Sequence, residues 1–298
     1  MMASSETRLD ARLRTAGLRL RTAGISDGRR EAEWLLAHAL GCSRLDLYRS
    51  NRTAATDDQD RTFSGLLERR IAREPLQYLL GTQEFWGFQF RVTPDVLIPR
   101  PETEQMIETA LARFPSTDSP LLLLDLCTGS GCLGVALARL YPNARIVATD
   151  LSGAALEVAR QNAAVHGVEK RIRFLQGDLF DPLRDTDLPG RVDAVVSNPP
   201  YVPTPDLAGL QPEVRLFEPR MALDGGRGGL DFYPRILAGA RNILRPGGAL
   251  FLEVGIHQAD RVREAAEGAG WRWTETVRDL AGIPRMIHLE NPEAALRG

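Results

Sequence analysis

Residues 121–132 read LLLLDLCTGSGC, an apolar run that leads directly into a loop with two glycines. The run has the length of a buried strand, and glycines after it permit positive φ angles and close approach of a ligand to the backbone. In a parallel sheet, ligands bind beyond the carboxyl ends of the strands, where the strand order reverses. Any tight turn from strand to helix can use glycines, so this pair alone is weak evidence for a site.

Strand-like and helix-like segments alternate through the chain after residue 102. Strands are predicted at residues 121–126, 145–149, 172–176, 192–197 and 249–254, with helices at 133–140, 152–166 and 230–244. This alternation predicts an α/β fold with a largely parallel sheet and right-handed crossovers. Segments 271–277 and 285–290, with a glycine-containing turn between them, predict a terminal hairpin with one antiparallel strand.

The first 80 residues show helical periodicity and no convincing strand. Residues 29–40 place apolar side chains on one helix face, and Gly41 follows as a C-cap. Thr56 precedes a second helix whose first turn is acidic, as the helix dipole favours. A small helical bundle is therefore predicted.

A structured connector follows this bundle. Residues 84–92 alternate aromatic side chains around a glycine, which predicts a β-hairpin. Residues 96–101 include two prolines, which disfavour helix and predict an extended segment.

Composition is that of a soluble globular chain. Its 298 residues, 43% hydrophobic and 26% charged, allow one large domain or two smaller ones. No apolar run approaches the roughly 18 residues needed to cross a bilayer. The first residues, MMASSETRLDARLR, hold no apolar segment of the kind a secretory signal needs. We therefore expect a cytoplasmic protein with no membrane association.

Charge, cysteine and histidine content narrow the function. The net charge of −2 is far from the basic footprint of a protein that binds a phosphate backbone. The three cysteines fit neither a disulfide framework nor a zinc site, and the four histidines are scattered. We therefore predict no metal, no catalytic thiol and no direct nucleic-acid partner.

Acidic residues follow the second and third predicted strands. Asp150 would lie where a ribose diol could donate two hydrogen bonds to it, although it also precedes a helix start at Ser152. Asp178 could accept from an adenine amine while Leu179 packs on the ring. With the glycine loop, these acids favour a nucleoside pocket. The spacing differs from the G-x-G-x-x-G dinucleotide fingerprint, so S-adenosylmethionine fits better than NAD.

The fourth strand ends in Ser-Asn-Pro-Pro-Tyr, residues 197–201. The two prolines stiffen the loop and remove backbone donors. The Asn198 side-chain oxygen and the Pro199 carbonyl can each accept one N–H of a planar amide, aiming its nitrogen at an activated methyl group. Tyr201 can lie against that amide and exclude water. Asn-Pro-Pro-Tyr at this strand end is the signature of methyltransferases that act on planar NH2 groups. We favour this interpretation over the alternative, in which the loop is only a rigid turn with an Asn cap.

Together these motifs resemble the HemK/PrmC family of protein-glutamine N5-methyltransferases, which modify the GGQ glutamine of class I peptide chain release factors. The resemblance covers nearly the whole chain and includes residues 75–79, 84–87, 96–104, 162–163, 198–201, 217–219, 229–231 and 279–282. It implies a Rossmann-like, seven-stranded class I SAM-dependent methyltransferase domain at 102–298. It also implies a helical substrate-recognition domain at 1–81 and a β-hairpin connector at 82–101.

The motifs and the resemblance together predict the site residues. S-adenosyl-L-methionine would be bound by Cys127, Thr128, Gly129, Ser130, Gly131, Asp150, Asp178, Leu179 and Asn198. The substrate glutamine would contact Asn198, Pro199, Pro200 and Tyr201, of which Asn198, Pro199 and Tyr201 are predicted to be catalytic. Two residues depart from the family pattern. Cys127 occupies a position that is often glycine in the family, and Leu179 occupies one that is often aromatic. We expect a monomer whose partners are release factors.

Three other functions compete with this prediction. A glutamine methyltransferase acting on a ribosomal protein shares the reaction, although residues 98–104 resemble the release-factor enzymes more closely. An adenine-N6 DNA methyltransferase would use the same loop on a flipped base, but it needs a basic cleft that the net charge does not favour. An inactive binding module would not need the intact Asn198 motif.

Overall fold

The structure, a computed structural model, describes residues 8–49 and 55–292. It divides into two compact units. Unit 1 is Met1–Thr82 with Gln211–Phe217, and unit 2 is Gln83–Leu210 with Glu218–Gly298. Within the described ranges, no helix combines the length and the apolar character that a membrane span requires.

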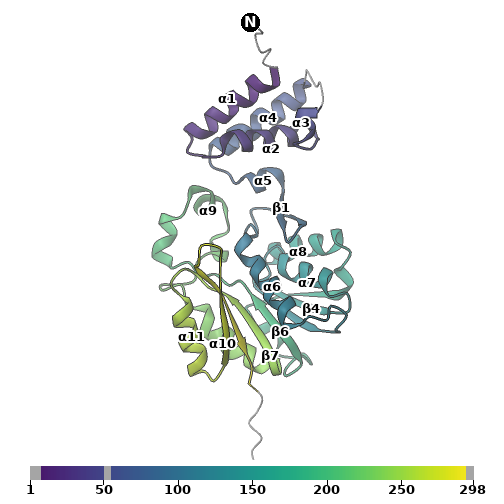
Figure 1. Cartoon of the computed structure of the whole chain (residues 1–298), viewed down its shortest axis with the longest axis vertical. Helices are drawn as coiled ribbons and strands as arrows, with labels where there is room; N and C mark the ends of the chain where they lie inside the picture. Colours follow the sequence, from purple (N-terminus) through teal and green to yellow (C-terminus); the bar gives the residue numbers. More distant parts are fainter. Residues whose placement is uncertain (1–7, 50–54, 293–298) are drawn as a thin grey trace, which may run out of the picture. The chain divides into compact units, whose positions relative to one another are not determined.

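Unit 1 is helical (Figure 1). Its helices are α1 (Arg8–Thr22), α2 (Gly28–Leu40), α3 (Asp46–Arg49), α4 (Asp57–Ile71), α5 (Leu76–Leu80) and α9 (Pro212–Phe217). The two helices predicted from the sequence are confirmed, because Gly41 caps α2 with a φ of 65° and Thr56 forms a capping box with Gln59 at the start of α4. Leu35 and Phe63 lie in the core between these helices.

Helix α9 comes from a later part of the chain than the rest of unit 1. The buried guanidinium of Arg70 pairs with Glu31 at 2.6 Å and with Glu213 of α9 at 3.0 Å. Arg73 pairs with the same Glu213 at 2.6 Å. Ion pairs thus hold α9 to the bundle, and removal of one partner would leave a buried charge uncompensated.

Unit 2 is built on a seven-stranded sheet in the order β5-β4-β3-β6-β7-β9-β8. The strands are β3 (Leu122–Leu126), β4 (Arg145–Asp150), β5 (Ile172–Gln176), β6 (Val192–Ser197), β7 (Leu244–Glu253), β8 (Arg272–Arg278) and β9 (Pro284–Glu290). Strands β3 to β7 pair in parallel, and β9 pairs antiparallel with both neighbours. The predicted α/β fold, parallel sheet and terminal hairpin are confirmed. The prediction started β7 too late, because residues 244–248 contain Pro and Gly and interrupt the register with β6.

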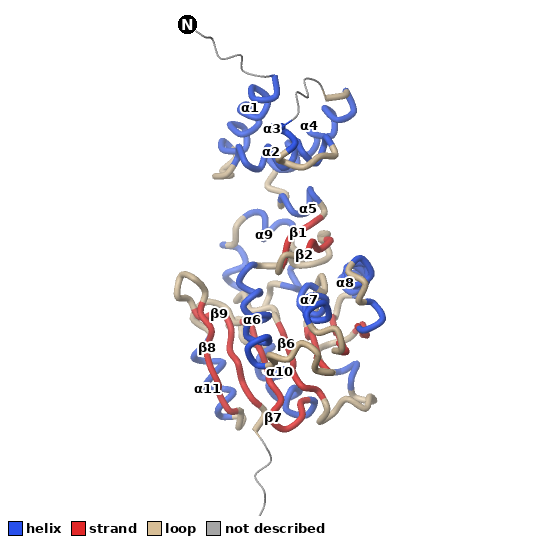
Figure 2. The backbone as a smooth tube through the Cα atoms, turned by 45° about the vertical axis from the view of Figure 1, so that its right-hand side comes forward, coloured by secondary structure: helices blue, strands red, loops and turns tan. Residues whose placement is uncertain are grey.

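Helices cover both faces of this sheet. Figure 2 shows α6 (Glu104–Arg113) and α7 (Cys132–Leu140) on one side, and α10 (Phe232–Ile243) and α11 (Ala259–Gly268) on the other. Two separate cores result, one with Met106 and Leu137 and the other with Tyr233 and Val262. The remaining helices of the unit are α8 (Gly153–Val165) and the 3-10 turns Pro101–Thr103, Glu169–Arg171, Asp181–Leu183, Thr204–Gly209 and Arg220–Ala222.

The predicted hairpin is confirmed as β1 (Thr82–Phe85) and β2 (Phe88–Arg91). Trp86 and Gly87 form its turn with φ angles of 51° and 71°, the left-handed pair that a two-residue hairpin loop favours. The backbone N–H of Trp86 donates to Glu104 of α6 at 2.7 Å. This bond anchors the turn to the helix that follows the connector.

Candidate functional site

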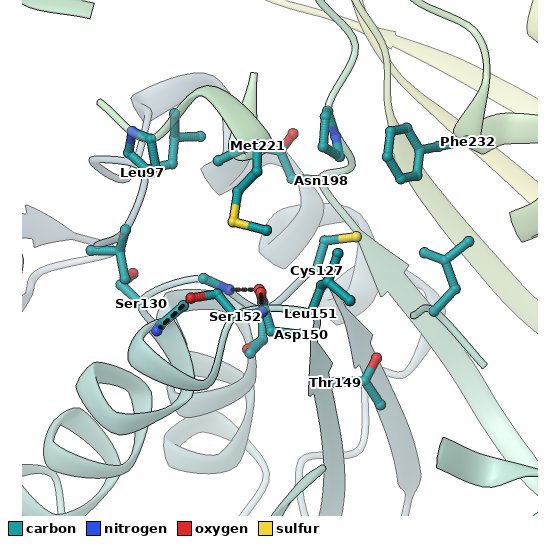
Figure 3. Close-up of a pocket in the computed structure, with 18 of the residues that line it drawn as sticks. Leu97, Cys127, Ser130, Thr149, Asp150, Leu151, Ser152, Asn198, Met221 and Phe232 are labelled. Atoms are coloured by element: carbon teal, nitrogen blue, oxygen red, sulfur yellow. Dashed lines mark hydrogen bonds between the residues drawn. The ribbon is translucent and has the colours of Figure 1, made fainter. Parts of the chain in front are cut away.

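A cavity of about 560 Å³ opens at the carboxyl ends of β3, β4, β5 and β6 (Figure 3). Its volume is within the range of small-molecule sites. Sheet register explains which residues meet there, because Leu126 of β3 pairs with Thr149 of β4 and with Ser197 of β6. The residues that follow these three positions therefore converge at the reversal of strand order, where open α/β sheets bind ligands.

The side chain of Asp125 holds the glycine loop after β3 through two hydrogen bonds. Its Oδ2 accepts from the Thr128 hydroxyl at 2.6 Å and from the Gly134 N–H at 3.0 Å. Gly129 has a φ of 54° and nothing within 4 Å of an added Cβ, so its backbone faces open space. Gly131 has a φ of 80°, and an added Cβ would lie 3.0 Å from the Cβ of Ala159. The loop therefore offers bare backbone to the cavity at one glycine and packs on α8 at the other.

Asn162 of α8 fixes the same loop from the side. Its Nδ2 donates to the Ser130 carbonyl at 2.8 Å and to the Arg91 carbonyl at 3.0 Å, while its Oδ1 accepts from Arg91 N at 2.7 Å. One buried amide thus ties the glycine loop to strand β2. Asn162 is among the residues that carry the family resemblance, but nothing in its local pattern distinguishes it from other helix residues, so no role was predicted for it.

Asp150 ends β4 and lines the cavity. Its Oδ2 accepts from the Gly129 N–H and its Oδ1 from the Ser152 N–H, both at 2.9 Å. Burial raises the pKa of Asp150, although these backbone donors lower it. The N-cap of α8 is Ser152, whose hydroxyl accepts from Ala155 N (Figure 3). Asp150 is therefore not the helix cap, and its oxygens keep further lone pairs for a ligand.

The segment after β5 brings Asp178 and Leu179 to the cavity wall. Leu179 is 6% exposed and has a φ of 49°. The carboxylate of Asp178 pairs with Arg235 at 2.6 Å, so one of its oxygens already has a cationic partner. Asp178, the predicted acceptor for an adenine amine, is thus already paired with Arg235, for which the sequence predicted no role.

Several wall residues were not predicted from the sequence. Figure 3 shows the Met221 side chain extending toward Asp150 and Ser152, with Leu97 and Phe232 on other sides of the cavity. They come from the connector, the Arg220–Ala222 turn and α10, which are far apart in the chain. Their apolar character gives no local signal, because side chains of this kind are far more often part of a core.

The Asn-Pro-Pro-Tyr loop borders the cavity after β6. Asn198 and Pro200 line it, whereas Gly131, Pro199 and Tyr201 do not contribute to the lining. The Asn198 Nδ2 donates to the Thr103 hydroxyl at 3.2 Å, and the Tyr201 hydroxyl donates to Glu253 Oε1 at 3.2 Å. The loop is held by Val202, whose N–H donates to the Leu223 carbonyl at 2.8 Å.

Glu253, at the end of β7, is an acid that the sequence analysis missed. It is 3% exposed and accepts from the hydroxyls of Thr103 and Tyr201. Burial raises the pKa of Glu253 to about 7. A pattern of acids at successive strand ends, extended to the fifth strand, would have pointed to it.

The cysteines near the loop do not provide a nucleophile. Burial raises the pKa of Cys132 to about 12 and also raises that of Cys127, so both thiols stay protonated at neutral pH. Among the residues placed in the structure, no group of three or more His, Cys, Asp or Glu side chains is arranged to hold a metal ion.

The sheet order, the glycine loop with Asp150, and the Asn-Pro-Pro-Tyr loop define a class I SAM-dependent methyltransferase. Residues 109–208 match the methyltransferase small domain, and residues 11–81 match the PrmC N-terminal domain. The chain is 47% identical to a release factor glutamine methyltransferase of Geobacter sulfurreducens over 89% of this chain and 90% of that one. It is 43% identical to the enzyme of that name from Cereibacter sphaeroides, over 95% and 98% of the two chains. The chain belongs to the release factor glutamine methyltransferase family.

Proposed function

We propose that this enzyme transfers the methyl group of S-adenosyl-L-methionine to the side-chain nitrogen, N5, of the GGQ glutamine in class I peptide chain release factors. The observation that carries the proposal is the orientation of Asn198 at the cavity wall. Its NH2 group is engaged by Thr103, so its oxygen is left to accept an N–H of a substrate amide. The relatives named for this reaction, which match over 89% or more of each chain, support the same substrate.

The residues at the cavity fit the proposed cofactor. When bound, S-adenosylmethionine supplies a methyl group activated by its sulfonium. Asp150 has lone pairs for the ribose hydroxyls, and the exposed backbone of Gly129 permits close approach of the ligand. We propose that Cys127, Thr128, Ser130, Gly131, Asp178, Leu179 and Asn198 complete this site, with Gly131 acting through the shape of the loop.

Catalysis in this proposal is positioning of a weak nucleophile. An amide nitrogen reacts poorly because its lone pair is delocalised into the carbonyl. Asn198 and the Pro199 carbonyl would accept its two N–H bonds and aim the nitrogen at the methyl group. Positive charge that develops on nitrogen during transfer would strengthen both hydrogen bonds. Pro200 and Tyr201 would keep the loop rigid and the amide dry.

The finer features of the partner are also proposals. We propose that residues 1–81 recognise the release factor, that residues 82–101 connect them to a catalytic domain at 102–298, and that the enzyme acts as a monomer in the cytoplasm. The net charge of −2 supports a protein substrate over a nucleic-acid one.

Methylation of a purified release factor tests this proposal. With methyl-labelled S-adenosylmethionine, we expect label on the release factor and none on a variant whose GGQ glutamine is alanine. Mass spectrometry of the digested product should place one methyl group on that glutamine. Parallel reactions with ribosomal proteins and with duplex DNA serve as controls, and label on either of these instead would overturn the proposed substrate.

A further inference from the structure

A buried network of hydrogen bonds lies behind the Asn-Pro-Pro-Tyr loop. Thr103 donates its hydroxyl proton to Glu253 Oε2 at 2.5 Å and accepts from Asn198 Nδ2 at 3.2 Å. The Tyr201 hydroxyl donates to the other oxygen of Glu253 at 3.2 Å. The Glu253 carboxylate is therefore linked to the loop twice, to Asn198 through Thr103 and to Tyr201 directly.

We propose that Glu253 is a positioning residue that acts through Thr103 to fix which end of the Asn198 amide faces the substrate glutamine. This inference rests on the proposed function, because it concerns how the substrate amide is held. It adds to that function a dependence on two residues that lie outside the Asn-Pro-Pro-Tyr loop.

The Thr103 hydroxyl has a single proton to donate. A carboxylate has no proton to give, so the Thr103 proton must point to Glu253. The remaining lone pairs of the hydroxyl can only accept, and the Asn198 atom beside them must therefore be the NH2 group. No other described residue donates to Asn198 Oδ1, which is the end left for the substrate. Donation thus runs from Asn198 to Thr103 and from Thr103 to Glu253, and it leaves Asn198 Oδ1 as a free acceptor.

Because this network is buried, water cannot replace its hydrogen-bond partners. Thr103 and Glu253 are each 3% exposed. Glu102 raises the pKa of Glu253 and Arg285 lowers it, while the Tyr233 hydroxyl donates to its backbone carbonyl at 3.1 Å. The carboxylate therefore has two hydroxyl donors and one nearby guanidinium to stabilise its charge, against a full loss of hydration.

Protonation of Glu253 would reverse the network. A protonated carboxyl can donate to Thr103, which then has its own proton free for Asn198. The amide could turn so that Oδ1 accepts that proton, leaving its NH2 group to face the NH2 group of the substrate. Donor would then face donor, and the hold on the glutamine would be lost. Since the pKa of Glu253 is raised to about 7, turnover should rise with pH through that region.

Substitution of Thr103 separates this role from simple packing. Thr103→Val keeps the shape but removes the hydroxyl, and we expect kcat on the release factor to fall about tenfold, the scale of one hydrogen bond. Thr103→Ser keeps the hydroxyl and should restore most of the activity. Thr109→Val is the matched control, because its buried hydroxyl donates only to the Gln105 carbonyl within α6, away from the cavity. The Kd for S-adenosylmethionine, measured by calorimetry, should change much less than kcat in all three variants.

The pH profile of kcat identifies the ionising group. Glu253→Gln should remove the rise near pH 7 and leave activity near the low-pH level of the wild type, while Thr103→Ser should retain the rise. Glu253→Gln is needed to assign the titration, because burial also raises the pKa of Asp125 to about 7. Carboxyl 13C NMR of the free enzyme provides a readout without turnover: a resonance that titrates near pH 7 should disappear in Glu253→Gln.

The outcomes distinguish this inference from the proposed function. If the wild type does not methylate the GGQ glutamine, the proposed function fails. If the wild type does so and Thr103→Val matches its kcat, or Glu253→Gln keeps the pH-dependent rise, the positioning role is wrong. Equal loss in Thr103→Val and Thr109→Val would likewise overturn it, since it would show a general effect of a missing buried hydroxyl.

Discussion

Asn198→Ala is expected to lower kcat by about 10²-fold or more, the scale seen when one oriented polar partner of a transition state is removed. The alanine leaves no side-chain acceptor for the amide nitrogen whose positive charge grows during transfer. The Asn198 side chain borders the cavity, and its amide donates a hydrogen bond to Thr103. Its removal should therefore lower the stability of the fold only slightly. The Kd for S-adenosylmethionine should change less than tenfold, because Asp150 and the glycine loop remain.

Single-turnover kinetics on a purified release factor, with calorimetry for the cofactor, measure these two quantities separately. Asn143→Ala is a matched control, since this exposed amide only donates to the Asp118 carbonyl at 2.9 Å. It should retain the wild-type rate. A variant Asn198→Ala that turned over at nearly the wild-type rate would contradict the proposed mechanism of amide positioning.

The parts of the site that follow strands could be predicted from the sequence. Parallel strands end at one edge of the sheet, so a polar residue just after each strand is brought to the same place. The glycine loop, Asp150 and Asn198 were predicted to lie together for this reason, and the structure places residues of all three on one cavity. The strands themselves were predictable because buried parallel strands are nearly continuous apolar runs.

Contacts between residues that are far apart in the chain could not be predicted in this way. Thr103 and Glu253 are 150 positions apart, and no periodic pattern links them. Arg70 and Glu213 are 143 positions apart, although their ion pair makes α9 part of unit 1. Such contacts depend on how elements pack in three dimensions. A single sequence records the side chains but not their proximity.

The two residues that depart from the family pattern, Cys127 and Leu179, both have strained backbones. Cys127 has a φ of 58° and Leu179 a φ of 49°, in the left-handed region that glycine enters without cost. The glycine that the family resemblance implies at position 127 would relieve this backbone strain, whereas nothing in the structure explains leucine at position 179. The cysteine side chain lines the cavity and keeps its proton, so it contributes shape and not reactivity.

Asp150→Ala should raise the Kd for S-adenosylmethionine by about 10²-fold or more, while kcat at saturating cofactor falls much less. Hydrogen bonds to a charged group contribute about 1.5–3 kcal/mol each, and the ribose would lose two of them. The substitution also removes the acceptor of the Gly129 and Ser152 N–H groups, so the loop facing the cofactor would lose its support. Both effects act on cofactor binding and neither acts on the substrate amide.

Calorimetric titration of the free enzyme with S-adenosylmethionine measures this effect without turnover. Asp187→Ala is the control, because Asp187 is largely exposed and pairs only with Arg191 on the surface. Asp150→Asn is more informative than either, because it keeps the size of the side chain and turns one oxygen into a donor. That donor would face the Gly129 or Ser152 N–H, so the asparagine should bind the cofactor no better than the alanine. Wild-type affinity in Asp150→Asn would mean that the carboxylate charge is not used, and wild-type affinity in Asp150→Ala would remove Asp150 from the cofactor site.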